Sequence, residues 1–354
     1  MSNSVTRVIT LEEHYVCPEV DTAFRKVVDQ SRLSATQRAK LAASEQFVKE
    51  SPLTDIGARR LAWMDGNGVD MQVLSYGDNC PQDLPAKDAV SLCRLANDYL
   101  AEHCKKHPDR FAGFAVLPVD APEEAAKEAK RAITELGLKG IGFKATYRGE
   151  EFLDGKRFAP IFEAIAELNV PFYLHPTETV PAVTASYYEG DSIPAGASQL
   201  LSGFGIGWHY ETGVAYLRLI ASGLLDAYPD MKLLIGHWGE LIPFYFDRLD
   251  ISFGPVGERL LGVSAGLPQR KVSDYFRQNM YVMPSGLHGG KVMDSATLVC
   301  LKEFGADRIV WANDYPYRGE SDLPNTKDWI GQLEVSPEDR EKIAHGNAER
   351  LLGL

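Results

Sequence analysis

The chain has 354 residues, of which 45% are hydrophobic and 24% are charged, a composition typical of a globular protein. Its formal net charge of -12 argues against a broad phosphate-binding surface, so we do not expect a nucleic-acid partner. The five cysteines are scattered without a CxxC pair, and we find no signal peptide and no apolar run long enough for a membrane helix, so we expect a cytoplasmic protein without a membrane partner.

Short β-rich segments alternate with helical segments along the chain. The predicted strands are residues 5–11, 71–76, 111–118, 140–145, 171–175, 232–237, 280–285 and 308–313, and clear helices are predicted over 88–107, 121–137, 157–169 and 211–229. Repeated strand-then-helix units produce parallel strands with crossover helices, and eight of them predict an α/β fold of the (β/α)8 TIM-barrel type. An open doubly wound sheet is the alternative, although no glycine-rich phosphate loop follows the first strand.

Two insertions interrupt this repeat. Residues 18–53 are polar and have a helical pattern, whereas residues 177–207 are rich in Gly, Pro, Ser and Thr and are predicted to form a long loop after the fifth strand. A loop of this length in a compact domain usually has a function, so we expect a lid or a subunit contact. Composition does not change along the chain, so we expect one barrel domain over residues 1–354.

Potential metal ligands occur where four of the predicted strands end. Glu12 and His14 follow the first strand, His175 ends the fifth and Asp314 follows the eighth, while His237 ends the sixth. In a barrel of this type, the carboxyl ends of the strands carry the catalytic groups. Side chains alternate along a strand, so Glu12 and His14 should share a face that Glu13 does not.

The donor types in this group indicate a mixed nitrogen and oxygen metal site. Neutral imidazoles and carboxylates suit one divalent cation, for which we expect zinc, with manganese as the alternative. Taken singly, each residue has an ordinary interpretation, such as a hydrogen-bonded core histidine or a turn-capping aspartate. His209 and His288 are weaker candidates, since packing or a loop position explains them.

The segments LEEH, FYLHP, GHWGE and NDYP together resemble the amidohydrolase-related decarboxylases, a family that acts on hydroxybenzoates. The resemblance extends from residue 5 to the end of the chain and implies a distorted (β/α)8 barrel with one divalent metal. It places Glu12, His14, His175 and Asp314 on the ligand positions. It also implies a homodimer or homotetramer.

The same resemblance assigns roles outside the ligand set. His237 falls on the active-site histidine and Glu240 on the acid that supports it, while Arg248 matches an arginine near the subunit interface. The sequence departs from the family at Lys144, which replaces an asparagine, and at Thr177 and Glu178, which replace an Arg-Asn pair. These departures concern the substrate more than the metal.

We therefore expect non-oxidative decarboxylation of an aromatic carboxylic acid that carries an ortho-hydroxyl group. In this hypothesis Asp314 protonates the ring carbon and His237 assists. Residues expected to bind substrate are Lys144, Trp208, Trp238, Arg248 and Tyr315, although the three aromatic residues could equally belong to the core. The alternative reaction is hydrolysis of a lactone, ester or amide by a metal-activated water.

Overall fold

The computed structural model describes residues 5–28, 35–262, 268–287, 292–318 and 324–354. Its strands are β1 (Ile9–Tyr15), β2 (Met71–Tyr76), β3 (Phe111–Ala115), β4 (Gly140–Lys144), β5 (Thr146–Tyr147), β6 (Glu151–Phe152), β7 (Phe172–His175), β8 (Leu233–Ile235), β9 (Met280–Val282) and β10 (Trp311–Ala312). Its α-helices are α1 (Pro18–Val27), α2 (Ala35–Glu50), α3 (Ala58–Asn67), α4 (Ala86–Lys106), α5 (Pro122–Thr134), α6 (Ala159–Leu168), α7 (Pro181–Val183), α8 (Ala195–Ser202), α9 (Gly207–Ala221), α10 (Leu224–Ala227), α11 (His237–Glu240), α12 (Phe246–Ser252), α13 (Pro255–Leu261), α14 (Val272–Asn279), α15 (Ser295–Phe304), α16 (Thr326–Gly331), α17 (Pro337–Glu341) and α18 (Asn347–Leu352).

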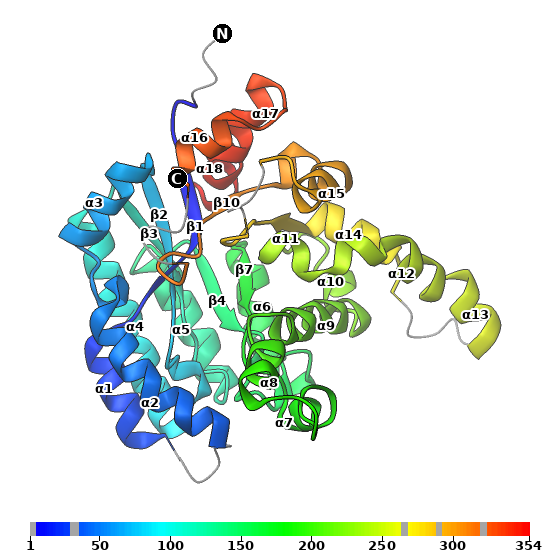
Figure 1. Ribbon diagram of the computed structural model, residues 1–354, viewed down its shortest axis with the longest axis horizontal. Helices are drawn as coiled ribbons and strands as arrows, with labels where there is room; N and C mark the ends of the chain where they lie inside the picture. Colours follow the sequence, from blue (N-terminus) through cyan, green and yellow to red (C-terminus); the bar gives the residue numbers. More distant parts are fainter. Residues whose placement is uncertain (1–4, 29–34, 263–267, 288–291, 319–323) are drawn as a thin grey trace.

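The main sheet has eight parallel strands in the order β10-β1-β2-β3-β4-β7-β8-β9. A parallel bridge between Val282 and Ile309 joins the two edges of the sheet. The sheet therefore curls into a barrel, although the strands pair only briefly where it closes. Helices surround the strands (Figure 1). The prediction of a distorted (β/α)8 barrel is confirmed, and the open doubly wound sheet is excluded by the closing bridge.

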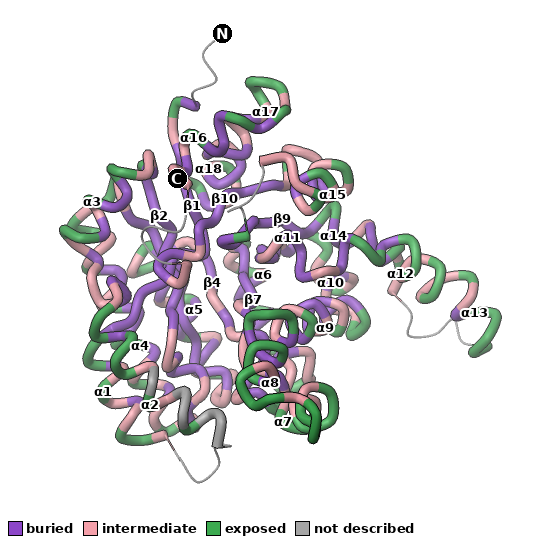
Figure 2. The backbone as a smooth tube through the Cα atoms, in the orientation of Figure 1, coloured by how far each residue is buried: buried purple, intermediate pink, exposed green. Residues whose placement is uncertain are grey.

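Buried side chains form two layers that follow the alternation of the strands. Tyr173 and Leu234 belong to the cluster inside the barrel, whereas their neighbours Phe172 and Leu233 belong to the larger cluster between the strands and the helices. The strands of the main sheet are mostly buried (Figure 2). This alternation places His175, two residues after Tyr173, on the inner face of the sheet.

The first strand begins and ends four residues later than predicted. It covers Ile9–Tyr15 rather than 5–11, so Glu12 and His14 lie within the strand. The pairing with β2 shifts between Thr10 and Glu13, which marks a β-bulge. Local composition does not reveal a bulge, since its position depends on the register of the neighbouring strand.

Both insertions contain helices. Residues 18–53 include α1 and α2 as predicted, although residues 29–34 lie outside the described part of the chain, as does His288. The segment 177–207 is not one irregular loop, because it contains α7, a π-helical turn over Thr184–Tyr188 and α8.

Helices α12 and α13 extend away from the barrel (Figure 1). Among the described residues, we find no helix with the length and apolar character needed to cross a bilayer.

Candidate active site

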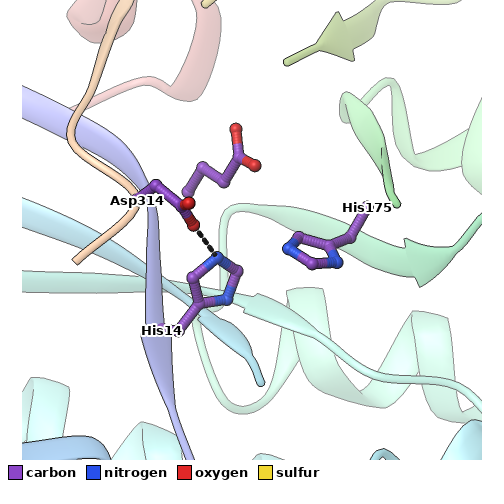
Figure 3. Close-up of side chains that lie close together, drawn as sticks. His14, His175 and Asp314 are labelled. Carbon is purple, nitrogen blue, oxygen red and sulfur yellow. Dashed lines mark ion pairs between the residues drawn. The ribbon is translucent and has the colours of Figure 1, made fainter. Parts of the chain in front are cut away.

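Glu12, His14, His175 and Asp314 converge at the carboxyl ends of β1, β7 and β10. One donor atom from each of the four residues lies within 4.8 Å of every other such atom. Figure 3 shows the carboxylate of Asp314 facing the ring of His14, with the ring of His175 beside them. The Nε2 atom of His14 is 3.0 Å from Oδ1 of Asp314. These residues come from distant parts of the sequence, as the barrel prediction requires.

Glu12 reaches this cluster because of the bulge in β1. Its φ of 55° lies in the left-handed region, so the inward position of Glu12 does not come from regular strand alternation alone. Tyr173 and Ser285 each donate a hydroxyl hydrogen bond to a different oxygen of its carboxylate. Glu13 points elsewhere, since its carboxylate accepts the backbone N–H groups of Asn313 and Tyr315 on either side of Asp314.

Hydrogen bonds orient the two imidazoles of the cluster. Nδ1 of His175 lies 2.7 Å from the carbonyl oxygen of Pro176, which only a protonated Nδ1 can satisfy. The lone pair of this ring is therefore on Nε2. Nδ1 of His14 lies 3.3 Å from Oγ of Ser75, which can hold its ring in the same way. Each histidine thus has an outer partner of the kind that fixes metal-binding imidazoles.

Burial controls the charge of the four groups. It lowers the pKa values of His14 and His175 well below the usual range, and the nearby positive charge of Lys144 lowers them further. It also raises the pKa of Glu12, and raises that of Asp314 well above the usual range, with Glu12 adding to the rise at Asp314. Neutral imidazoles beside one buried and one half-buried carboxyl group are a donor set that a divalent cation would stabilise.

Two atoms in the cluster give a structural test of whether a cation fits. Nε2 of His14 and Oδ1 of Asp314 are both buried, and although they lie 3.0 Å apart, neither makes a hydrogen bond of acceptable geometry among the described residues. Buried polar atoms are nearly always satisfied, so a pair of unsatisfied donors or acceptors requires an explanation. A divalent cation shared by the four residues would satisfy both atoms.

His237 lies at the edge of this cluster and is held by Glu240. Its Nδ1 is 2.7 Å from Oε1 of Glu240, and its Nε2 is 3.8 Å from Oε1 of Glu12. Burial opposes a charge on this ring, but Glu240 and Glu12 outweigh that effect and raise the pKa of His237 to about 9. The ring can therefore carry a proton at neutral pH and present it toward the cluster.

Glu240 also contacts a second histidine, His209. Nδ1 of His209 is 2.9 Å from Oε2 of Glu240, and Nε1 of Trp208 donates a hydrogen bond to Nε2 of His209. Burial would raise the pKa of Glu240, but the charge of His237 and the hydrogen bond from His209 lower it. Glu240 therefore stays ionised between the two imidazoles.

The backbone is strained at most of these positions. Glu12, His237, Glu240, Ser285 and Asp314 are non-glycine residues with positive φ values between 46° and 60°. Such conformations cost about 1–3 kcal/mol each in unfavourable cases and concentrate where function requires a fixed direction. Strain at five positions around one cluster is consistent with a site that selection has shaped for chemistry.

The remaining residues predicted to bind substrate lie in different surroundings. Nζ of Lys144 is 3.4 Å from Nδ1 of His175, at the edge of the cluster. The indole of Trp238 is buried and donates to the carbonyl of Leu287, which fits a core position. Contact between Trp238 and substrate stays a prediction, as it does for Trp208, which holds His209.

Tyr315 and Arg248 are not brought to the cluster. The ring of Tyr315 is fully buried and packs at 4.2 Å between centroids against Trp63, on the side of β10 that faces the helices. Arg248 is exposed on α12, which points away from the barrel. The core interpretation of Tyr315 and the interface interpretation of Arg248 agree better with these positions than substrate contact within one chain.

Apart from Glu240, which the family resemblance assigned to His237, the groups that hold the site residues were not predicted from the sequence. Tyr173 could have been found, because it lies two residues before His175 and so shares its face. Ser285 and Ser75 carry no such signal. Capping or packing at a helix start was the interpretation of His209, whose partner Glu240 lies 31 positions away.

Residues 52–354 match the amidohydrolase family. A γ-resorcylate decarboxylase from Polaromonas sp. (strain JS666) is 36% identical over 313 residues, which cover 86% of this chain and 89% of that protein. The similarity therefore includes nearly the whole barrel.

Two solved structures are similar in both sequence and fold. A dihydroxybenzoic acid decarboxylase from Polaromonas sp. JS666, with bound manganese and the inhibitor 2-nitroresorcinol, is 32% identical with a TM-score of 0.78, over 98% of this chain and 97% of that one. A 5-carboxyvanillate decarboxylase from Novosphingobium aromaticivorans, complexed with manganese and 4-hydroxy-3-methoxy-5-nitrobenzoic acid, is 27% identical with a TM-score of 0.85, over 100% of both chains.

Proposed function

This chain belongs to the amidohydrolase family, and we propose that it is a metal-dependent carboxy-lyase that removes carbon dioxide from an ortho-hydroxylated aromatic acid. The observation that carries the proposal is the convergence of Glu12, His14, His175 and Asp314 within 4.8 Å, with His237 beside them. Its relatives are decarboxylases of hydroxylated benzoates, and we infer the reaction class from them.

We propose that these four residues hold one divalent metal ion. When bound, the ion would offset the negative charge of the substrate and help to orient it in the site. Two imidazoles and two carboxylates suit either manganese or zinc. Zinc was the first expectation from the sequence, but bound manganese in two related structures favours manganese.

The proposed proton path runs through Asp314. Its carboxyl group would accept the proton of the substrate's own ortho-hydroxyl group and pass it to the ring carbon that bears the carboxylate. The bond to the carboxyl carbon then breaks, carbon dioxide leaves, and the bonding electrons restore the aromatic ring. The product departs as a phenolate and takes a proton from His237 or from water.

Two groups at the edge of the site would recognise the rest of the substrate. Protonated His237, oriented by Glu240, would donate from Nε2 to an oxygen of the substrate. Lys144 adds a cation beside His175, which favours a second electronegative substituent on the ring. We expect this chain and its relatives to accept different substituents at that place on the ring. The family resemblance places an asparagine of the relatives at the position of Lys144.

We propose that the whole chain forms one barrel domain and acts as a homo-oligomer in the cytoplasm. Apolar side chains that are exposed just before α12 and at the end of α13 support association. Phe244 and Tyr245 are 59% and 56% exposed, and Leu260 and Leu261 are 72% and 71% exposed. Exposed apolar groups in this number usually mark an interface.

Hydrolysis is the alternative, because an inward aspartate and histidine on one metal can also serve attack on a lactone, ester or amide. The purified holoprotein should therefore be incubated with hydroxybenzoates, including 2,6-dihydroxybenzoate and 5-carboxyvanillate, and with lactones and aryl esters. We expect carbon dioxide release from at least one hydroxybenzoate and no hydrolysis above the metal-only background. Hydrolysis without any carbon dioxide release would replace the decarboxylase assignment.

A further inference from the structure

His209, His237 and Glu240 form a second group of potential metal ligands, with donor atoms within 4.8 Å of one another. Their contacts are nevertheless those of hydrogen bonds. The two Nδ1 atoms lie 2.7 Å and 2.9 Å from the two oxygens of Glu240, the usual lengths for an N–H donor on a carboxylate. Protons rather than a second cation therefore occupy this network.

Trp208 determines which nitrogen of His209 carries the proton. An indole N–H can only donate, so Nε2 of His209, at 2.9 Å from it, accepts the bond and holds no proton. The proton of the neutral ring is then on Nδ1 and points at Oε2 of Glu240. His237 occupies Oε1 from the other side, so both oxygens of Glu240 are taken and its carboxylate plane cannot rotate freely.

The backbone holds the two elements together at the same place. Helix α9 carries Trp208 and His209 in its first turn, and Gly213 lies one turn further on. A Cβ atom at Gly213 would be 2.7 Å from the carbonyl oxygen of Glu240, a distance that real Cβ atoms do not reach. Glycine at this position therefore allows α9 to approach the turn that carries His237 and Glu240.

We propose that His209 is a positioning residue that fixes the carboxylate of Glu240 and, through it, directs Nε2 of His237 toward the metal and substrate site. This inference rests on the proposed function for its effect on turnover. The side chain of His209 is 12% exposed and lies outside the group that would touch substrate, so its contribution is to geometry. Groups that orient a catalytic residue typically affect activity by about 10- to 100-fold.

The test compares two replacements of His209. His209→Leu removes the N–H that Glu240 accepts, whereas His209→Asn keeps a donor close to the position of Nδ1. We expect His209→Leu to lower kcat by about 10- to 100-fold with KM changed by less than about 2-fold. His209→Asn should recover most of the lost kcat. His103→Leu replaces a half-buried histidine of α4 whose ring packs on Tyr99; it is the matched control and should keep the wild-type rate.

A second measurement does not depend on turnover. In protein labelled with 15N-histidine, the ring N–H of His237 that bonds to Glu240 should give a downfield signal, which His209→Leu shifts or broadens and His209→Asn leaves in place. Wild-type kcat in His209→Leu, an equal loss in both variants, or an unchanged His237 signal in His209→Leu would each overturn the inference. If the proposed function fails instead, the wild type releases no carbon dioxide while its N–H signals respond as described.

Discussion

Asp314 and His237 lie at the same cluster but have different contacts. Replacing either one should lower turnover, whereas only the replacement of Asp314 should weaken metal binding. Asp314→Asn keeps the shape of the side chain but removes the acid that transfers the proton. His237→Ala removes a neighbour of Glu12 but no proposed ligand. We expect both variants to lose at least about 100-fold in kcat, the usual contribution of general acid–base groups. His237→Ala should bind as much metal as the wild type, whereas Asp314→Asn should bind less tightly.

Initial rates of carbon dioxide release and metal content of the purified variants measure both effects. Asp191→Asn is the matched control for Asp314→Asn, because Asp191 is exposed in the segment between β7 and α9. Circular dichroism establishes that each variant is folded. A wild-type rate in either active-site variant would contradict the proton path proposed here.

The sequence predicted which four side chains would come together, but not most of the groups that hold them. Histidines and acids at strand ends are visible because a barrel brings those ends together, whatever the details of packing. The bulge that turns Glu12 inward depends on pairing with β2, and the hydroxyl of Ser285 comes from a residue 273 positions away. Such contacts join residues that are far apart in the sequence. They depend on the tertiary structure, so local sequence patterns do not predict them.

Among the secondary-structure elements, the bounds of the helices and central strands were predicted better than those of the first and last strands of the barrel. The prediction of a helix over 88–107 agrees with α4 at Ala86–Lys106, because a long amphipathic pattern determines its position. The eighth strand, predicted over 308–313, is reduced to Trp311–Ala312 because the barrel closes there through one bridge. Composition alone could not place α7 and α8 inside the segment 177–207, where Gly and Pro are frequent.

The segment 177–207 is anchored near its start by one buried acid of α9. Oε1 of Glu211 accepts the backbone N–H of Val180 at 3.0 Å, and Glu211 is 7% exposed. Beyond this anchor the segment exposes apolar groups such as Tyr187, which is 72% exposed. Opening of the segment should therefore depend on this hydrogen bond.

Glu211→Ala should make the segment easier to cleave by a protease. Loss of a hydrogen bond worth about 1 kcal/mol would raise the open population, and with it the cleavage rate within 181–206, by about 5-fold. Glu211→Gln keeps an oxygen acceptor and should be cleaved at nearly the wild-type rate. Limited proteolysis with mass spectrometry of the fragments measures the difference. Equal cleavage of all three proteins would show that Val180 is held in another way.

At the scale of the whole molecule, the site concentrates negative charge in a protein that is already acidic. The formal net charge is -12, and the pKa values of the buried Glu12 and the half-buried Asp314 are both raised by desolvation. Ionising both groups in the absence of a cation would cost folding free energy, because each charge is desolvated and repels the other. A divalent metal should therefore support the fold as well as the reaction.

Removal of the metal tests this coupling. We expect protein treated with a chelator to lose its decarboxylase activity and to melt at a lower temperature, because an ion at about 100 times its Kd stabilises the folded state by about 2.7 kcal/mol. Manganese or zinc should restore both properties. Magnesium is the control and should restore them poorly, since it prefers oxygen ligands and two of the four donors here are imidazoles. Calorimetry together with initial rates measures the recovery, and full activity in metal-free protein would rule out the metal site that the four side chains form.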